Sequence, residues 1–154
     1  MQYLLHLESP IGPLTLTEED GALIRLDFGK QGQAWPETTL LAEAKKQLEQ
    51  YFSGTLRSFT LPLRPEGTPF QQKVWAALLQ IPWGETRTYG QVAAMIGQPK
   101  ACRAVGMANH RNPLSILVPC HRVVGADGSL TGYGGGLEAK QFLLELEKRH
   151  GKAV

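Results

Sequence analysis

Apolar and polar residues alternate along the first part of the chain in a way that predicts a small antiparallel sheet. Residues 3–7 and 14–17 alternate with a period of two, and turn-forming residues fill 9–13 between them, so the two runs predict a β-hairpin. Residues 22–28 predict a third strand. Over 38–52 the apolar positions recur every three or four residues and Gly54 follows, which predicts a helix with one apolar face.

The apolar positions of this first half predict a core, and no catalytic cluster is evident among them. The helix stripe illustrates this: its apolar members are Leu41, Ala44, Leu48, Tyr51 and Phe52. Such stripes are far more often packing surfaces than sites.

The second half of the chain predicts short helices joined by tight turns. Thr68 can cap a helix with Pro69 at its first position, and the apolar face that follows ends before Pro82. Residues 89–96 and 100–110 predict two helices around the turn 97–99, a length and punctuation typical of a helix-turn-helix. A last helix is predicted over 137–149.

The helix predicted over 100–110 has an unusual number of small side chains: Ala101, Ala104, Gly106 and Ala108. A glycine inside a helix costs about 0.5–1 kcal/mol relative to alanine, so a close approach of some other surface should compensate. That surface could be a nucleic-acid groove, with Arg103 as a long cation, or another helix. Periodicity alone favours helix packing.

Length and composition are those of a folded protein that needs no metal or disulfide to support its core. The chain has 154 residues, of which 42% are hydrophobic. The Pro-rich passage 61–67 predicts a linker, which divides the chain into an N-terminal α/β structural domain (1–66) and a second domain (67–154). No run approaches the ~20 apolar residues of a membrane span and no export signal is evident, so we predict a cytoplasmic protein without a membrane partner.

Charge is distributed unevenly between the two predicted domains. The first carries 6 basic and 9 acidic side chains, whereas the second carries 10 basic and 5 acidic ones. No acid lies between Glu85 and Asp127, a window that contains five basic residues: Arg87, Lys100, Arg103, Arg111 and Arg122. This is the pattern of a surface that meets phosphates, although a solvated basic face would look the same.

The segment Pro119-Cys120-His121-Arg122 holds the best candidates for chemistry. It places a soft nucleophile beside a titratable ring and a cation, at the end of an apolar run. A cysteine is reactive as its thiolate, and with a pKa near ~8.5 it needs a nearby base or positive charge to reach that form. The alternative is a buried structural cysteine, which is the commoner situation for a free thiol.

Five segments of the second half occur in the order found in one enzyme family: Tyr89-Gly90-Gln91-Val92-Ala93, Arg103-Ala104-Val105-Gly106, Asn112-Pro113, Pro119-Cys120-His121-Arg122-Val123 and Gly132-Tyr133-Gly134-Gly135-Gly136. The chain resembles the 6-O-alkylguanine-DNA alkyltransferases, also called methylated-DNA-protein-cysteine methyltransferases. The resemblance covers 68–147 closely, while the first half resembles the family only in size and element order. It implies an α+β fold, with an N-terminal ribonuclease H-like sheet and helix and a C-terminal winged helix-turn-helix domain.

The resemblance implies DNA repair by direct damage reversal. Members of the family move the alkyl group from 6-O-alkylguanine onto the cysteine that corresponds to Cys120, once per molecule and without a cofactor. His121 resembles the base that acts on the thiol through a water. Glu147 resembles the carboxylate that orients this base, with Glu145 as a competitor nearby in sequence.

Other site residues also follow from the resemblance. Tyr89 resembles the phenol that donates to the guanine ring, and Asn112 resembles the hinge residue beside the nucleophile. The substrate pocket is expected to include four further residues: Val123, Tyr133, Gly134 and Gly135.

The implied partner is double-stranded DNA, bound through the minor groove with the alkylguanine flipped out of the stack. Arg103 resembles the cation that fills the gap, while Ala104, Gly106 and Ala108 would permit close contact and Arg122 is a further DNA-binding candidate. We expect a monomer in solution, with cooperative assembly on DNA left open.

Two other functions remain in view, a noncatalytic lesion-binding protein of the same fold and an unrelated cysteine hydrolase. The presence of Cys120 argues against the first, and its adjacency to His121 argues mildly against the second. No metal is predicted, because the first half has no cysteine and His6 alone cannot form a zinc site.

Overall fold

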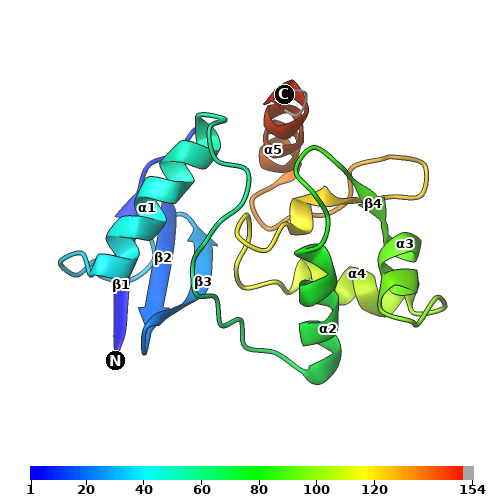
Figure 1. The fold of residues 1–154 in the computed structure, drawn as a ribbon, viewed down its shortest axis with the longest axis horizontal. Helices are drawn as coiled ribbons and strands as arrows, with labels where there is room; N and C mark the ends of the chain where they lie inside the picture. The colour runs from blue at the N-terminus through cyan, green and yellow to red at the C-terminus, as the bar shows by residue number, and fades with distance from the viewer. Residues whose placement is uncertain (151–154) are drawn as a thin grey trace.

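The computed structural model describes residues 1–150, so the last four residues of the predicted second domain, 151–154, lie outside the described part. The first half forms a three-stranded antiparallel sheet in the order β1 (Gln2–Leu7), β2 (Leu14–Glu19) and β3 (Ala22–Phe28). Helix α1 (Thr39–Phe52) lies against this sheet (Figure 1). All three strands and this helix were predicted from the hydrophobic period, and the predicted α+β class is confirmed.

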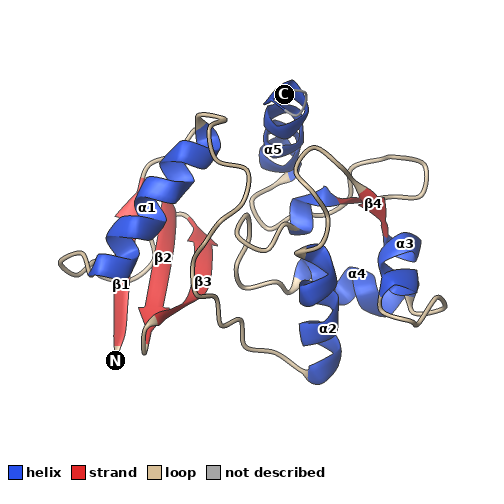
Figure 2. Cartoon of the chain, viewed as in Figure 1, coloured by secondary structure: helices blue, strands red, loops and turns tan. Residues whose placement is uncertain are grey.

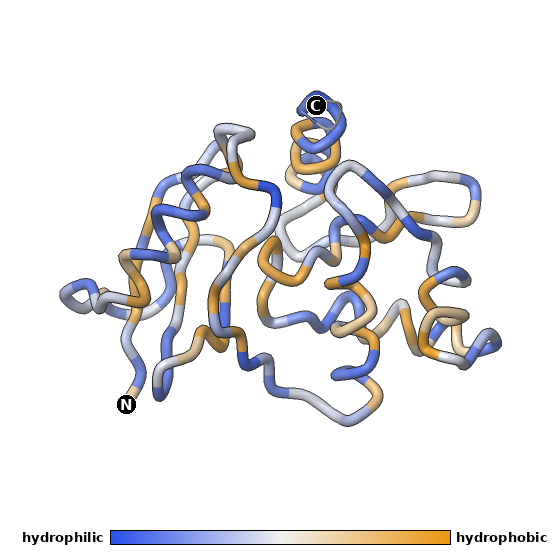
Figure 3. Tube along the Cα trace, viewed as in Figure 1, coloured by the Kyte–Doolittle hydropathy of each residue, from blue (hydrophilic) through white to orange (hydrophobic). Residues whose placement is uncertain are grey.

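Local sequence explains the register of the sheet. Glu19 pairs with Ala22 across the two-residue turn Asp20-Gly21, whose φ angles are 50° and 80°. An Asp-Gly pair tolerates two positive φ angles, which is what the tightest hairpin turns require. Figure 3 shows hydrophilic and hydrophobic residues alternating along α1, as expected for a helix with one buried face.

The second half is mostly helical (Figure 2). Its elements in order are α2 (Pro69–Leu78), β4 (Arg87–Thr88), α3 (Tyr89–Met95), α4 (Cys102–His110), the 3-10 helix η1 (Cys120–Arg122), β5 (Val123–Val124) and α5 (Leu137–His150). The four α-helices were predicted, with α4 beginning two residues later than expected, whereas the 3-10 helix η1 was not. The parallel pair β4–β5 was not predicted, because two residues are too few to show a period.

Small residues let α4 pack closely on α2. The indole Nε1 of Trp75 on α2 donates a hydrogen bond of 2.9 Å to the carbonyl of Ala108, and both residues are buried. Ala108 was expected to face DNA, but it lies on the inner side of α4 with Val105. Helix packing therefore uses one face of α4 and leaves the other free.

The edge of β3 joins the two halves of the molecule. The N–H of Leu23 in β3 donates to the carbonyl of Pro62 in the linker. The N–H of Leu26 donates to the carbonyl of Pro113, in the segment that leads to Cys120, at 2.8 Å. Figure 1 shows this segment and α5 between the sheet and helices α2–α4. Covering the edge leaves no open strand there and fixes the segment before Cys120 against the sheet.

Within residues 1–150 no helix combines the length and the apolar character needed to cross a membrane.

The start of α2 offers a test of local stability. Thr68 and Gln71 form a capping box, in which each side chain accepts a hydrogen bond from the other residue's backbone N–H. We expect Thr68→Ala to lower the free energy of unfolding by about 1 kcal/mol, since it leaves a helix N–H without its partner. Denaturant unfolding measures the loss. Thr86→Ala, at an exposed threonine whose hydroxyl has no role in a cap, should change stability by less than about 0.5 kcal/mol.

Candidate active site

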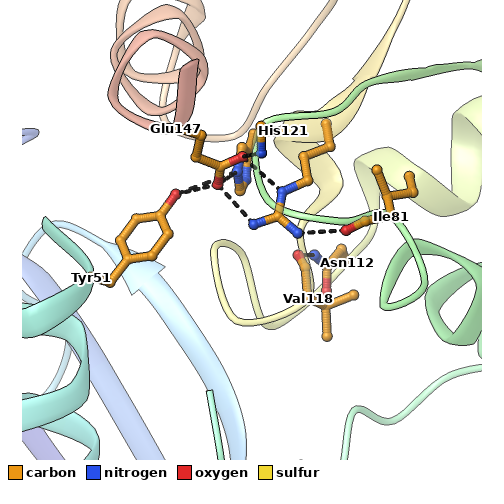
Figure 4. Close-up of polar contacts among 8 residues, drawn as sticks. Tyr51, Ile81, Asn112, Val118, His121 and Glu147 are labelled. Carbon is orange, nitrogen blue, oxygen red and sulfur yellow. Dashed lines mark hydrogen bonds and ion pairs between the residues drawn. The ribbon is translucent and has the colours of Figure 1, made fainter. Parts of the chain in front are cut away.

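Asn112 holds the turn that presents Cys120. Its amide Nδ2 donates to the carbonyl of Val118 at 2.8 Å, and its Oδ1 accepts from the N–H of Leu114 at 2.9 Å (Figure 4). Within the turn, Ile116 has a φ of 73°, which is rare for a β-branched residue. The side chain of Asn112 thus supplies hydrogen bonds that hold a strained backbone just before the cysteine.

Cys120 lies at the base of a pocket and is nearly buried, with 4% of its surface exposed. Burial raises the pKa of the thiol above its ordinary value. Hydrogen bonds to Asn112 and Ser115 and the positive charge of Lys140 act in the opposite direction. The resting side chain is therefore a thiol, surrounded by groups that favour the anion once a base removes the proton.

A fully buried imidazole and carboxylate lie next to the cysteine. His121 Nε2 is 2.7 Å from Oε2 of Glu147, whose residue is 1% exposed. Burial opposes ionisation of Glu147. The positive charge that His121 can take up, the hydrogen bonds from His121 and Arg122, and the charge of Arg122 outweigh it and hold the pKa of this carboxyl well below its usual range. Glu145, the competitor in sequence, instead bonds Gln141 on the exposed side of α5.

This contact defines the form of the imidazole. An ionised carboxylate only accepts, so Nε2 carries the hydrogen and Nδ1 carries the lone pair. Burial lowers the pKa of His121 below its ordinary value despite the opposing influence of Glu147, which keeps the ring neutral near pH 7. Nδ1 is buried and has no hydrogen-bond partner among the described residues, so its lone pair is available as a base.

Arg122 is placed differently from its predicted DNA-facing position. Its Nε and Nη2 donate to the two oxygens of Glu147 at 2.8 and 2.9 Å, and its Nη1 donates to the carbonyl of Ile81 at 2.6 Å (Figure 4). The residue is 7% exposed. The guanidinium therefore balances a buried carboxylate instead of meeting phosphates, because a buried charge requires an opposite charge with matching geometry.

Tyr51 brings the first half of the chain into this network, where no contribution to a site was predicted. Its ring belongs to the buried stripe of α1, as expected, but its hydroxyl donates to Oε2 of Glu147 at 2.6 Å. No local sequence signal could have revealed this, since the partner lies 96 positions further along the chain.

The pocket above Cys120 is formed by both halves of the chain and has a volume of about 360 Å³. The first half contributes residues at the end of β3 and after it: Arg25, Leu26, Asp27, Phe28 and Gln31. The second half contributes the end of α4, the Asn112 turn and the loop before α5. The ring of Tyr133 packs edge-on against Phe28, with 5.6 Å between centroids, so this aromatic contact joins the two walls.

Three of the four predicted pocket residues lie at or beside this cavity. Tyr133 and Gly134 line it, and Gly135 follows them. A Cβ on Gly135 would lie 2.6 Å from the Phe28 ring, so a side chain there would displace the ring. Val123 does not line the cavity, because it is fully buried in β5, where it pairs with Arg87 of β4.

Tyr89 lies behind the pocket loop. Its hydroxyl is hydrogen-bonded to the hydroxyl of Thr131, two residues before Tyr133, and Tyr89 is not among the residues that line the cavity.

Lys140 is a buried cation near the cysteine that was not predicted. Its Nζ donates to the carbonyl of Thr131 at 3.2 Å. Burial lowers the pKa of Lys140, and the sulfur of Cys120 opposes that change. Lys140, Leu143 and Glu147 follow each other at three and four residues, and this helical spacing could have placed Lys140 on the inner face of α5.

Of the residues predicted to meet DNA, Arg103 and Ala104 lie on the outer face of α4. Arg103 and Ala104 are exposed, and Met107 is 58% exposed. Gly106 is half-buried and its Cα faces the ring of Tyr89, since a Cβ there would contact the ring at 3.8 Å. Asn109, at the inner end of α4, donates to the carbonyl of Cys120 at 3.3 Å.

Comparison with known proteins identifies the family. Residues 69–149 match the model of the 6-O-methylguanine DNA methyltransferase DNA-binding domain, and residues 3–65 match its ribonuclease-like domain. The chain belongs to the 6-O-methylguanine DNA methyltransferase family. The predicted ribonuclease-like and DNA-binding character of the two halves is thereby confirmed.

Relatives across this methyltransferase family match nearly the whole chain. A methylated-DNA–protein-cysteine methyltransferase of Methanosarcina barkeri is 54% identical over 94% of this chain and 96% of its own length. The constitutive enzyme of Bacillus subtilis is 49% identical over 96% of both chains. The crystal structure of Mycobacterium tuberculosis OGT in complex with DNA has 50% identity, with a TM-score of 0.89 over 96% of this chain and 94% of that one.

The Arg122–Glu147 pair offers a test of the buried network. We expect Arg122→Met to lower the free energy of unfolding by about 3–5 kcal/mol, because it leaves Glu147 buried without its cation. Thermal and denaturant unfolding measure the loss. The matched control is Arg25→Met, which breaks the exposed pair with Asp27 and should cost no more than about 1 kcal/mol. Equal losses in the two variants would contradict the structural role of the buried pair.

Proposed function

We propose that this protein repairs DNA as a methylated-DNA–protein-cysteine S-methyltransferase, moving the alkyl group of 6-O-alkylguanine irreversibly onto Cys120. The observation that carries the proposal is the buried thiol at the base of a pocket, next to a neutral imidazole held by an ionised carboxylate. The chain's membership of the methyltransferase family and its similarity to a relative solved in complex with DNA support the same function.

The first step is removal of the thiol proton. His121 accepts it at Nδ1 through a bridging water, while Nε2–H remains bonded to Glu147. The imidazolium that forms is stabilised by the carboxylate. Arg122 already balances Glu147 in the resting state, so the neutral ring is retained until the thiol gives up its proton.

The second step is displacement at the alkyl carbon. The sulfur forms a bond to that carbon as the bond from carbon to guanine O6 breaks. The guanine anion that leaves accepts one proton at its ring from the hydroxyl of Tyr89, and the proton that His121 took from the thiol restores that hydroxyl through solvent. In the structure the Tyr89 hydroxyl bonds Thr131 and Tyr89 does not line the cavity, so this role requires the hydroxyl to leave Thr131 and turn to the base. Tyr133 and Gly134 line the wall against which the base lies, and Gly135 follows them in the chain.

Each molecule acts once. The product is a thioether, which has no carbonyl for water to attack, so Cys120 is not regenerated. This outcome separates the reaction from that of a cysteine hydrolase, whose acyl-enzyme is released by water.

DNA is bound through the minor groove by the outer face of α4, with the alkylguanine flipped into the pocket. Arg103 is exposed and fills the gap left in the stack, while Ala104 and the adjacent Gly106 allow close approach. Residues 67–154 form the DNA-binding and alkyl-acceptor domain, and residues 1–66 form a structural domain that completes the pocket. The protein is a monomer in solution. Several molecules could bind neighbouring sites on the same DNA cooperatively, each through its own α4.

Transfer to Cys120 is tested by mixing the protein with duplex DNA that carries 6-O-methylguanine. We expect the Cys120 peptide to gain about 14 Da, one methyl per chain, in a bond that resists hydrolysis. Cys120→Ala should bind the lesion without gaining mass, and label on this variant would contradict the assignment. Binding by the wild-type chain without a mass change would instead indicate a noncatalytic lesion-binding protein.

The role of Arg103 is tested by comparing two substrates. Arg103→Ala should slow transfer from duplex DNA by about tenfold or more, since extrusion costs a few kcal/mol, but it should react with free 6-O-benzylguanine at a near-normal rate. Lys46→Ala removes an exposed charge from α1 and should leave both rates within about twofold. Equal losses on both substrates for Arg103→Ala would contradict its role in extrusion.

A further inference from the structure

Tyr51 occupies an unusual position for a residue of the ribonuclease-like half. It is fully buried on α1, and its ring packs against three other aromatic rings: Phe52, Phe59 and Trp83. Its hydroxyl leaves this aromatic cluster and reaches Glu147 of α5 (Figure 4). The ring is thus fixed by packing, and the hydroxyl is directed at the carboxylate that orients His121.

Three donors share one oxygen of that carboxylate. Oε2 of Glu147 accepts from Tyr51 Oη at 2.6 Å, from His121 Nε2 at 2.7 Å and from Arg122 Nη2 at 2.9 Å. Oε1 accepts from Arg122 Nε at 2.8 Å and, at 3.4 Å, from the N–H of Gly84. Tyr51 and His121 therefore compete for the same negative charge, with 3.5 Å between Oη and Nε2.

The hydroxyl can act only as a neutral donor to Glu147. Burial, and then the charge of Glu147, raise the pKa of Tyr51 well above its ordinary value, so it keeps its proton. The other charged or titratable groups near His121 are Arg122 of η1, Lys140 of α5 and the adjacent Cys120. Both cations oppose protonation of His121, and the hydroxyl of Tyr51 bonds the same carboxylate oxygen that would attract that proton.

On the basis of the proposed function, in which His121 removes the thiol proton, we propose that Tyr51 is a positioning residue for alkyl transfer. It fixes the orientation of Glu147 and limits how strongly this carboxylate attracts a proton to the imidazole. If His121 were already protonated at neutral pH, it could not accept the proton of Cys120. The N-terminal half thereby takes part in setting the reactivity of the nucleophile.

The test compares Tyr51→Phe with the wild-type full-length chain. Phenylalanine keeps the ring in its aromatic cluster and removes only the hydroxyl. The protonation of His121 is followed by NMR of histidine-labelled protein, with its signal assigned by its loss in His121→Gln. We expect the midpoint to move upward by about 0.5 pH units or more in Tyr51→Phe, because Glu147 would then act more strongly on the imidazole.

A matched control removes a hydroxyl elsewhere in the same half. Tyr3 packs edge-on against Trp35 and its hydroxyl lies outside the Glu147 network, so Tyr3→Phe should leave the midpoint unchanged. The acid limb of the transfer rate should move with the midpoint in Tyr51→Phe only. An unchanged or lowered midpoint in Tyr51→Phe would overturn the proposal and leave Tyr51 as a packing residue.

A second background tests whether Tyr51 acts through Glu147. In Glu147→Gln the carboxylate is gone, so adding Tyr51→Phe should cause no further upward movement of the His121 midpoint. A shift as large as in the native background would overturn the proposed route. The titration does not depend on activity, so a wild-type chain that fails to methylate Cys120 would contradict the proposed function and still leave the role of Tyr51 measurable.

Discussion

The double contact between Arg122 and Glu147 is the interaction on which the rest of the site depends. A carboxylate with only 1% of its residue exposed needs an opposite charge, and the guanidinium provides it with two bonds at 2.8 and 2.9 Å. Since the pair is neutral overall, His121 beside it need not carry a charge. Arg122 also donates to the carbonyl of Ile81, which connects the segment after α2 to the segment that contains Cys120.

Much of the fold could be predicted from the sequence, because local chemistry decides it. The alternation over 3–7 and 14–17, the Thr68 cap and the three- and four-residue period of α1 each predicted an element that the structure contains. The five ordered motifs likewise indicated Cys120 and His121, and the family resemblance indicated Glu147, which bonds His121. These residues are carried by short segments whose composition reflects their chemistry.

Other features could not be predicted because they arise from contacts between distant segments. Arg122 was expected to face DNA since a cation in an acid-free window usually lies on a surface, and nothing local shows that it is buried. Tyr51 was expected to be core, which is correct for its ring and incomplete for its hydroxyl. Val123 was expected beside the pocket but is buried in β5, paired with β4. The sequence could not show this, because a two-residue strand has no period.

The two cysteines differ in exposure, and this difference affects which of them is oxidised or alkylated first before the protein meets DNA. Cys102 is exposed at the start of α4, whereas Cys120 is enclosed and its pKa is raised by burial. Oxidants and electrophiles attack thiolates that they can reach, so they would consume Cys102 first. Under the proposed single transfer to Cys120, this difference preserves the acceptor sulfur, and a count of total free thiols would not report how many molecules can still accept an alkyl group.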